Sequence, residues 1–414
     1  MANNLDLDLA RQYFDEAAAI FARDGGQLWN IPLGGPLIFV DYETRQVIAN
    51  QPDAEGQLAP QGGIWVGKIP PEVMIANTAL AWAGVNWMML IWQLLPDDPQ
   101  RRAEFIAHEA FHRIQADLGL GIPQLDKVNE HLDTLDGRYW LQLEWRALES
   151  ALLTENAARA TAIADALLFR ARRREVFPRA ADEERAMEMH EGLAGYTGCR
   201  LSGMTAAQMA ERLHQAPARF TSFMDSFAYA SGPAYGYLLD TIQPTWRVGL
   251  TPTHDFGKML QAALSLTLSP DLPEAAAARA LLYAGEALWQ SEVARDQERQ
   301  AQIKAYRARL LEGPALILPL SEVQCAFDPR TTMPIPESGT VYPFVQIIDA
   351  WGMLDVKEGG LWMANDWSTA RIVAPEEHTG RPLTGDGWTL HLAEGWEIAP
   401  AERPGDLIVQ RCRV

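Results

Sequence analysis

The sequence predicts an α+β protein with a mixed sheet near the N-terminus, an α-rich middle and a small all-β C-terminal domain. Between residues 35 and 95, short runs of β-branched and aromatic residues lie between Gly and Pro breaks, as strands do. From about Arg101 the apolar residues recur at helical spacing in a stretch rich in Ala, Leu, Glu and Arg. After Gly313 and Pro314 the pattern returns to short apolar runs split by Gly, Pro, Asp and Thr.

These changes of composition place two boundaries in the chain. Residues 1–100 hold an amphipathic N-terminal helix and a β-rich part, residues 101–314 form an α-helical domain, and residues 315–414 form a β domain. A chain of 414 residues has enough material for two or three domains with sizeable cores. We expect the first two parts to build one unit together and the third to stand as a separate module.

In the N-terminal part, strands are predicted within "GPLIFVDYETRQVIANQPD" (residues 35–53) and "GGIWVGKI" (residues 62–69). The next segment, residues 73–95, carries no charge and is long enough to span a bilayer. However, Asn and Gln residues interrupt it, and no Lys or Arg cluster beside it marks a cytoplasmic side. Its tryptophans also lie inside the segment rather than at its ends, where a membrane helix would place them. We therefore expect buried strands that turn near "AGVN" in preference to a membrane helix.

In the middle of the chain, the spacing of apolar residues predicts seven helices. They are expected near residues 101–118, 139–175, 180–197, 205–215, 220–242, 254–268 and 273–312. The densest basic run, "RARRRE", falls within the second of them, and we interpret it as a solvated helix face rather than an anion site. C-terminal strands are expected within residues 340–354, 360–366, 370–375, 387–400 and 406–414.

Charge and cysteine content limit the classes of partner and compartment. The formal charge of -19 repels polyanions, so we expect no nucleic-acid partner and no anionic membrane partner. Three cysteines are too few for a disulfide scaffold, although Cys325 and Cys412 can pair and leave Cys199 free. The N-terminus lacks a basic-then-apolar leader, which predicts a cytoplasmic protein, or a secreted or periplasmic one if a leader was removed. The sequence does not fix the oligomeric state.

The segment "AEFIAHEAFHRIQ" (residues 103–115) carries the chemistry. Residues four apart lie one turn above the other on a helix, so His108 and His112 can offer two imidazoles to one ion. Glu109 is one step round the helix, where its carboxylate can reach a metal-bound water without being a ligand itself. HExxH is a short motif, and the competing interpretation is a helix whose histidines have ordinary polar partners.

A second segment, "EMHEGLAGYTG", supplies a carboxylate in a helix that is rich in small residues. "HEAFH" followed by "EGLAGY" resembles the gluzincin clan of zinc metallopeptidases, in which an "EGxxxY"-like segment often carries a glutamate ligand. The resemblance covers about a quarter of the chain. It implies one Zn²⁺ per chain held by His108, His112 and Glu191, with Glu109 as general base. The "GxMEN"-type strand of the clan's aminopeptidases is missing before His108, which weakens the exopeptidase interpretation.

Two other carboxylates compete for the third ligand position. Glu144 lies on the next predicted helix, where a network with Arg146 is the alternative role. Glu130, in "NEHLD", is the other, and a solvated loop is its alternative. Only Glu191 has the Gly and Tyr of the clan pattern, so it is our first choice.

The chain must also provide a neutral donor for the oxyanion that forms during hydrolysis. In related enzymes a Tyr or His from a helix after the glutamate ligand does this. The segment "FAYASGPAYGYLLD" offers Tyr229, Tyr235 and Tyr237, and His254 follows; our prediction is Tyr235, against a core role for the same ring.

Other polar residues near the motifs have weaker assignments. Gln115, Asp133 and Asp136 are candidates to orient the ligand imidazoles, against ordinary roles as helix or cap residues. His190 adjoins Glu191, but α-helical spacing turns it to another face, so we leave it out of the site.

Together these features predict a zinc-dependent metallopeptidase whose substrate is a peptide or protein. Residues 73–95 are then a candidate sheet edge for an extended peptide, or simply core, and the C-terminal β domain is a candidate for positioning substrate or partner. The alternatives are hydrolysis of a small amide, and a non-catalytic metal-binding or partner-binding protein that retains a gluzincin-like fold.

Overall fold

The computed structural model describes residues 5–71, 73–121, 129–327, 331–335, 338–377 and 380–412. Helices take 46% and strands 21% of it, which confirms the α+β class. The chain forms two compact units. The first comprises residues 1–128, 140–217 and 227–283, and the second comprises residues 129–139, 218–226 and 284–414.

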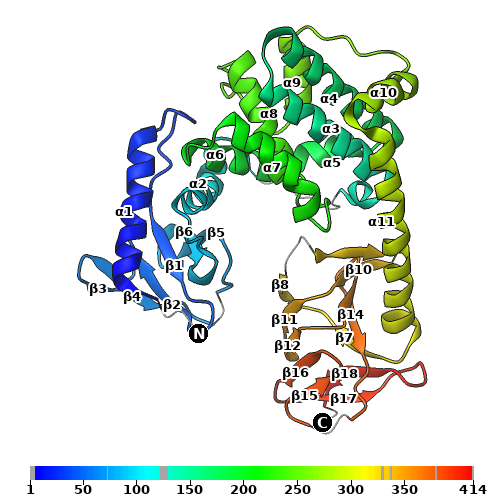
Figure 1. Ribbon diagram of the computed structural model, residues 1–414. Coiled ribbons are helices and arrows are strands. Elements are labelled where there is room, and N and C mark those ends of the chain that lie inside the picture. Colours follow the sequence, from blue (N-terminus) through cyan, green and yellow to red (C-terminus); the bar gives the residue numbers. More distant parts are fainter. Residues whose placement is uncertain are drawn as a thin grey trace. The chain divides into compact units, whose positions relative to one another are not determined.

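The first unit begins with a six-stranded mixed sheet (Figure 1). Its strands are β1 (Leu37–Val40), β2 (Gln46–Ala49), β3 (Ala59–Gln61), β4 (Ile64–Lys68), β5 (Thr78–Trp82) and β6 (Val85–Ile91). Their order is β3-β4-β2-β1-β6-β5, with β1 antiparallel to β2 and parallel to β6. The predicted mixed sheet is therefore confirmed, and β5 lies at its edge.

The uncharged segment forms a hairpin, as its polar interruptions predicted. β5 and β6 pair antiparallel from Thr78↔Met89 to Trp82↔Val85. The two residues between them, Ala83 and Gly84, both have positive φ, which is the backbone of a type I′ hairpin turn. Among the described residues, every helix is too short or too polar to cross a membrane.

The first helix, α1 (Leu7–Asp24), lies against this sheet (Figure 1). The Asp6 side chain caps its N-terminus by accepting from two backbone N–H groups of the first turn. Phe14 stacks on Phe39 of β1 at 4.7 Å between ring centroids, and Tyr13 meets Trp92 at 5.7 Å. This packing fixes one side of the sheet, and the β6 strand of the same sheet supports the next helix.

The helices that follow build most of the first unit. They are α2 (Pro99–Gln115), α3 (Leu135–Leu153), α4 (Asn156–Val176), α5 (Ala180–Met187), the π-helical turn η3 (Glu188–Gly192), α6 (Leu193–Leu201), α7 (Ala206–Arg219), α8 (Ala228–Ile242), α9 (Phe256–Ala263) and α10 (Leu272–Ala280). The prediction of one helix over 139–175 was wrong, because the chain breaks after Leu153 and Asn156 has positive φ. A break at Ala284, also at positive φ, likewise divides the helix predicted over 273–312.

Close backbone contact defines the crossing of α6 and η3 with α8. A Cβ atom built on Gly232 would lie 2.3 Å from Cα of Gly192, and one built on Gly236 would lie 2.2 Å from the ring of Tyr196. Only glycine permits this approach at both positions, because any side chain must push the helices apart. The hydroxyl of Tyr196 completes the junction by donating to the Asp240 carboxylate on α8 at 2.8 Å.

A network of buried charges lies behind the same turn. Arg170 and Arg173 of α4 are both buried, and together they form ion pairs with four carboxylates: Glu144 on α3, Glu184 on α5, Glu188 on η3 and Asp255 at the start of α9. The interpretation of "RARRRE" as a solvated face is therefore wrong for these two arginines. Both arginines point into the interior of the first unit. Their charge is tolerated there because acidic side chains from other elements neutralise it.

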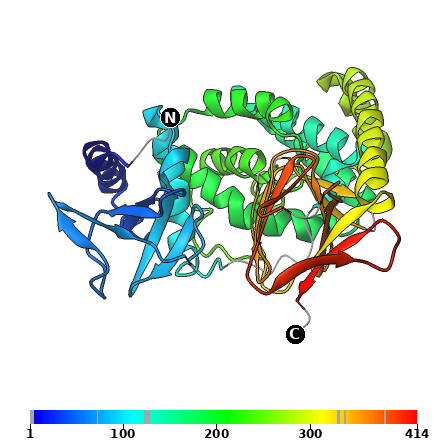
Figure 2. The same ribbon diagram turned by 90° about the horizontal axis from the view of Figure 1, so that it is seen from below.

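The second unit contains the helix α11 and two sheets (Figure 2). Its elements are η2 (Glu130–Asp133), α11 (Gly285–Tyr306), the π-helical η5 (Arg307–Glu312), β7 (Ala315–Pro319), β8 (Gln324–Phe327), β9 (Met333–Ile335), β10 (Gly339–Tyr342), β11 (Val345–Asp349), β12 (Gly352–Val356), β13 (Leu361–Ala364), β14 (Thr369–Val373), β15 (Leu383–Gly385), β16 (Trp388–Leu392), β17 (Trp396–Pro400) and β18 (Leu407–Arg411). The orders are β17-β18-β7-β14-β13-β10-β9 and β15-β16-β12-β11-β8. Buried residues from both sheets form one core cluster, as in a sandwich.

The cysteines are unpaired. Cys325 lies on β8 of the five-stranded sheet, and Cys412 follows β18 of the seven-stranded sheet. Both are free thiols, as is the buried Cys199, so the pairing that the sequence left open does not occur.

The helix crossing can be tested by replacing Gly232 with Ala. The added methyl group overlaps Gly192, so we expect the free energy of unfolding to fall by about 1–3 kcal/mol, as for other overpacked cores. Urea denaturation measures this change. Gly121→Ala is the control, because a Cβ there meets no described atom within 4 Å. Equal stability of the two variants would contradict the close crossing.

Candidate metal centre

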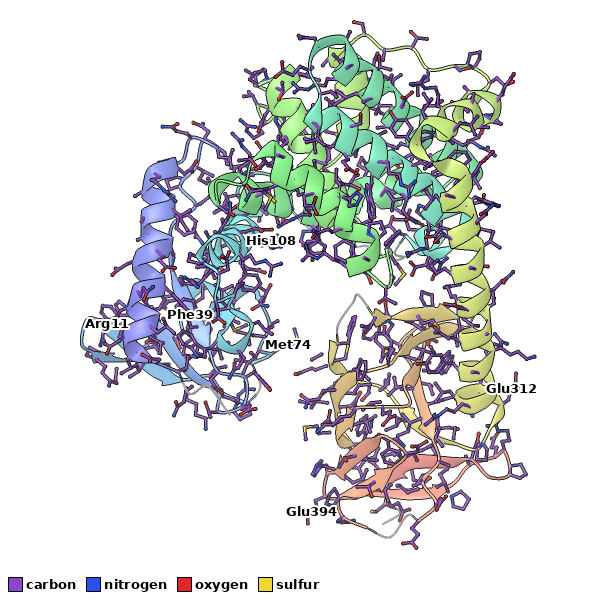
Figure 3. All side chains as sticks on the ribbon, in the orientation of Figure 1. Arg11, Phe39, Met74, His108, Glu312 and Glu394 are labelled. Atoms are coloured by element: carbon purple, nitrogen blue, oxygen red, sulfur yellow. The ribbon has the colours of Figure 1, made fainter. Side chains whose placement is uncertain are left out.

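Helix α2 holds the two motif histidines in place from one side. The Asp98 carboxylate caps the helix by accepting from the backbone N–H of Arg101 at 2.8 Å, and Pro99 occupies the first turn. Ile106, Ala110 and Phe111 bury the apolar face of α2, which packs against α6 and β6. His108, labelled in Figure 3, therefore projects from a helix that is fixed on both flanks.

Three side-chain atoms converge at this point. The Nε2 atoms of His108 and His112 lie 3.1 Å apart, and Oε2 of Glu191 lies 3.3 Å from the first and 3.4 Å from the second. An ion bound tetrahedrally at the usual zinc distances of about 2.0–2.1 Å separates its ligand atoms by about 3.3 Å. The triangle therefore has the size that a single Zn²⁺ requires.

The same oxygen of Glu191, Oε2, also has no ordinary hydrogen-bond partner among the described residues. Its contacts with the two rings lack hydrogen-bond geometry, and Oε2 is buried with no hydrogen-bond partner among the described residues. A buried carboxylate oxygen in that condition costs free energy unless a cation or a proton meets it. Of all His, Cys, Asp and Glu side chains that the structure describes, these three form the one group whose ligand atoms gather closely enough for an ion.

The turn η3 brings Glu191 to the site with an unusual backbone. Residues 188–192 form a π-helical turn, which is wider than an α-helical turn, so side chains next to each other in sequence diverge less. His190 consequently reaches the same region, with its ring centroid 4.7 Å from that of His112. The expectation that His190 faces elsewhere was wrong, because it assumed α-helical spacing through the turn.

Gln115, one turn after His112, orients the rings. Its Nε2 donates to the backbone carbonyl of Met189, so Oε1 points to the histidines and lies 3.1 Å from Nδ1 of both His112 and His190. His112 donates Nδ1–H to this oxygen, which turns its Nε2 towards the ion position. Gln115 thus makes the contact with the His112 ring that the orienting role weighed from the sequence requires.

The other two candidates for this orienting role have different environments. Asp133 accepts from the Ser222 hydroxyl and the Phe223 backbone N–H inside the second unit. Asp136 lies in the first turn of α3. Asp133 is thus engaged in its own unit, and Gln115 alone of the three contacts a ligand ring.

Electrostatics couple the three groups. Burial would raise the pKa of Glu191, but the polar contacts and positive charge of His108 and His112 outweigh it and hold that pKa well below its usual range. Burial would lower the pKa of His112, but Glu191 outweighs it and raises the value to about 9. The Glu191 carboxylate and the two imidazoles therefore attract one another electrostatically.

Glu109 lies beside this group in a dry environment. Glu109 is only 6% exposed, and its Oε2 has no hydrogen-bond partner among the described residues. Burial raises the pKa of Glu109, with a partial offset from the charges of His108 and His112. The carboxyl is close enough to feel both histidines, yet it is not one of the three converging groups.

The rival ligands lie elsewhere. Glu144 is fully buried, and its two oxygens accept from Arg170 at 3.1 Å and Arg173 at 2.6 Å. Glu130 is an exposed residue of η2, in the second unit. Within the first unit, therefore, Glu144 is engaged by the two arginines and Glu191 is the candidate whose oxygen lies beside the histidines.

The structure also distinguishes the candidate oxyanion donors. Tyr235, our choice from sequence, is fully buried and donates its hydroxyl hydrogen to Glu144 at 2.7 Å. Tyr237 donates to the Met204 carbonyl at 2.6 Å, and His254 pairs with Thr251. Tyr229, which sequence reasoning ranked lower, stacks on His108 at 5.7 Å between centroids.

This arrangement corrects the prediction for Tyr235. Its single hydroxyl hydrogen is committed to the Glu144 carboxylate inside the buried charge network, so it has none to give to an oxyanion. Spacing alone could not decide among three tyrosines that lie on one helix. The partner that decides the choice, Glu144, comes from a distant part of the chain.

Metal content tests the site directly. We expect about one Zn²⁺ per purified chain by elemental analysis, and a loss of affinity of more than about 100-fold in His112→Ala and in Glu191→Gln, because each removes a ligand. Chelator competition measures the affinity. His214→Ala is the matched control, since His214 is exposed and pairs with Glu149 instead. Unchanged zinc content in both ligand variants would exclude this centre.

Comparison of the whole chain with known proteins gives no further guide to its role. No model of a protein family, no curated protein and no solved structure matches it. The case for function therefore rests on the side chains gathered around α2 and η3.

Proposed function

We propose that this protein is a zinc-dependent peptidase in which Glu109 acts as the general base on water. The observation that carries the proposal is the triangle formed by His108, His112 and Glu191. The buried carboxyl of Glu109 follows His108 in the sequence, and its Oε2 has no hydrogen-bond partner among the described residues. His108, His112 and Glu191 would hold Zn²⁺, which would supply a water of lowered pKa and polarise the substrate carbonyl.

The burial of Glu109 suits it to move a proton. A general base works best when its pKa lies near the working pH, and burial shifts the pKa of Glu109 upward in that direction. In the proposed reaction its carboxylate takes a proton from the attacking water and later gives it to the leaving amine nitrogen. Its unpartnered oxygen is free of any competing hydrogen bond among the described residues.

Tyr229 is the residue that we assign to oxyanion stabilisation. It is half-buried on α8, and its ring lies nearly parallel to that of His108, at an interplanar angle of 20°. A tyrosine hydroxyl donates without changing charge, which is the property that a developing oxyanion requires. The close crossing of η3 and α8 at Gly192 holds α8 near the ligands.

The N-terminal sheet offers a place for an extended substrate. β5 is an edge strand of its sheet and packs against α2, the helix that carries the histidines. An extended peptide can add to such an edge through main-chain hydrogen bonds. This supports peptide bonds as the substrate over small amides, which have no strand to pair.

The general-base role can be tested by Glu109→Gln. We expect a folded protein that retains zinc, with peptide cleavage reduced about 100-fold to 10,000-fold, because the amide cannot accept the proton. Cleavage of a fluorogenic peptide library measures the rate, with Glu149→Gln as the control. Survival of cleavage in Glu109→Gln would rule out this mechanism. A zinc-loaded wild-type protein that cleaves no peptide would favour the non-catalytic alternative.

Tyr229→Phe tests the oxyanion donor separately. Removing one such donor usually lowers kcat about 100-fold to 1,000-fold, so we expect that loss with little change in KM. Tyr237→Phe is the comparison, because that hydroxyl bonds a backbone carbonyl on another segment. A kcat equal to that of wild type in Tyr229→Phe would remove Tyr229 from the mechanism.

A further inference from the structure

Two elements carry the three converging ligand atoms, and one buried side chain joins these elements. His108 and His112 belong to α2, whereas Glu191 belongs to the turn η3. The backbone of η3 packs against α8 and against its chain neighbours α5 and α6. Among the described residues, the polar contacts between α2 and η3 are those of the three ligands and those of Gln115.

Gln115 is the last residue of α2 and is only 2% exposed. Its Nε2 donates to the carbonyl oxygen of Met189, in the middle of η3, at 3.1 Å. On the other side of the same amide, Oε1 lies 3.1 Å from Nδ1 of His112. A single planar group therefore connects a ligand on the helix with the backbone of the turn that carries the third ligand.

The two ends of η3 are held by other contacts, and these lead to other helices. Glu188 at the start of the turn binds Arg170 of α4 with both carboxylate oxygens. Gly192 at its end lies against Gly232 of α8. These contacts place the turn relative to α4 and α8 but do not join it to α2. The amide of Gln115 supplies that remaining constraint.

We propose that Gln115 is a positioning residue that braces η3 against α2 and so places Oε2 of Glu191 at the spacing that one ion requires. The inference rests on the proposed function, because it concerns the same metal site. It goes beyond the orientation of the His112 ring, since the brace acts on the carboxylate ligand through the backbone of its turn. A metal ion accepts its ligand atoms only within narrow distance limits, so a small shift of the turn weakens binding.

The test is a double-mutant cycle between Gln115→Met and Glu191→Gln, measured as zinc affinity by chelator competition. Methionine keeps the length of the side chain and removes the amide donor and acceptor. In the wild-type background we expect Gln115→Met to lower the affinity about 10-fold to 100-fold, as for other outer partners of metal ligands. In the Glu191→Gln background, where the carboxylate is already lost, we expect the same change to cost no more than about 2-fold.

The cycle distinguishes the brace from the orientation of the His112 ring. If Gln115 acted on that ring alone, its replacement would cost the same in both backgrounds, because His112 remains a ligand in each. An equal loss would therefore overturn the proposal, and so would wild-type affinity in Gln115→Met. Gln12→Met is the matched control, because Gln12 is exposed on α1 and donates to Glu16 of the same helix.

Circular dichroism and thermal melting of the metal-free variants establish that each is folded. If Gln115→Met does not fold, Gln115→Glu takes its place in the cycle. An ionised carboxylate there can accept from a ring N–H but cannot donate to the Met189 carbonyl. The same two changes in affinity are expected of it, and the same outcomes would contradict the brace.

The results separate this inference from the proposed function. If wild-type protein binds no Zn²⁺, both fail. If it binds zinc and loses peptide cleavage in Glu109→Gln, while the cycle shows no coupling, only the role of Gln115 is wrong. If the cycle shows the coupling and wild-type protein cleaves no peptide, the brace stands and the peptidase proposal fails.

Discussion

The whole site depends on one backbone contact, the approach of η3 to α8 at Gly192 and Gly232. Because a Cβ on Gly232 would lie 2.3 Å from Cα of Gly192, the two elements meet with no side chain between them. That contact carries Glu191 towards the face of α2 where the histidines lie and keeps Tyr229 of α8 beside His108. The two residues "EG" of the second motif thus serve separate physical purposes. Glu191 places an oxygen beside the two histidines, and Gly192 lets the turn η3 approach α8 closely.

Behind the turn, buried charges perform a different task. Arg170 and Arg173 bind Glu144, Glu184 and Glu188 in the interior, an arrangement that rarely adds stability when compared with apolar packing. It does fix geometry, because moving any one partner leaves an unpaired charge in a dry environment, at a cost of several kcal/mol. Since Glu188 begins the π-helical turn, the network limits where Glu191 can point.

The sequence predicted those parts of the site that depend on local spacing. His108 and His112 could be paired because residues four apart share a helix face, and the hairpin of β5 and β6 followed from polar residues in an apolar run. His190 could not be predicted, because a π-helical turn leaves no mark that distinguishes it from α-helix. Tyr235 was misassigned because its partner, Glu144, lies 91 residues earlier in the chain.

The number of protein ligands bears on what the ion would do. Structural zinc sites are closed by four protein groups, whereas catalytic sites use three and keep one position for water. Here three groups converge among the described residues. A fourth position open to water and the buried Glu109 carboxyl beside the three groups are the two features that the proposed hydrolytic function requires.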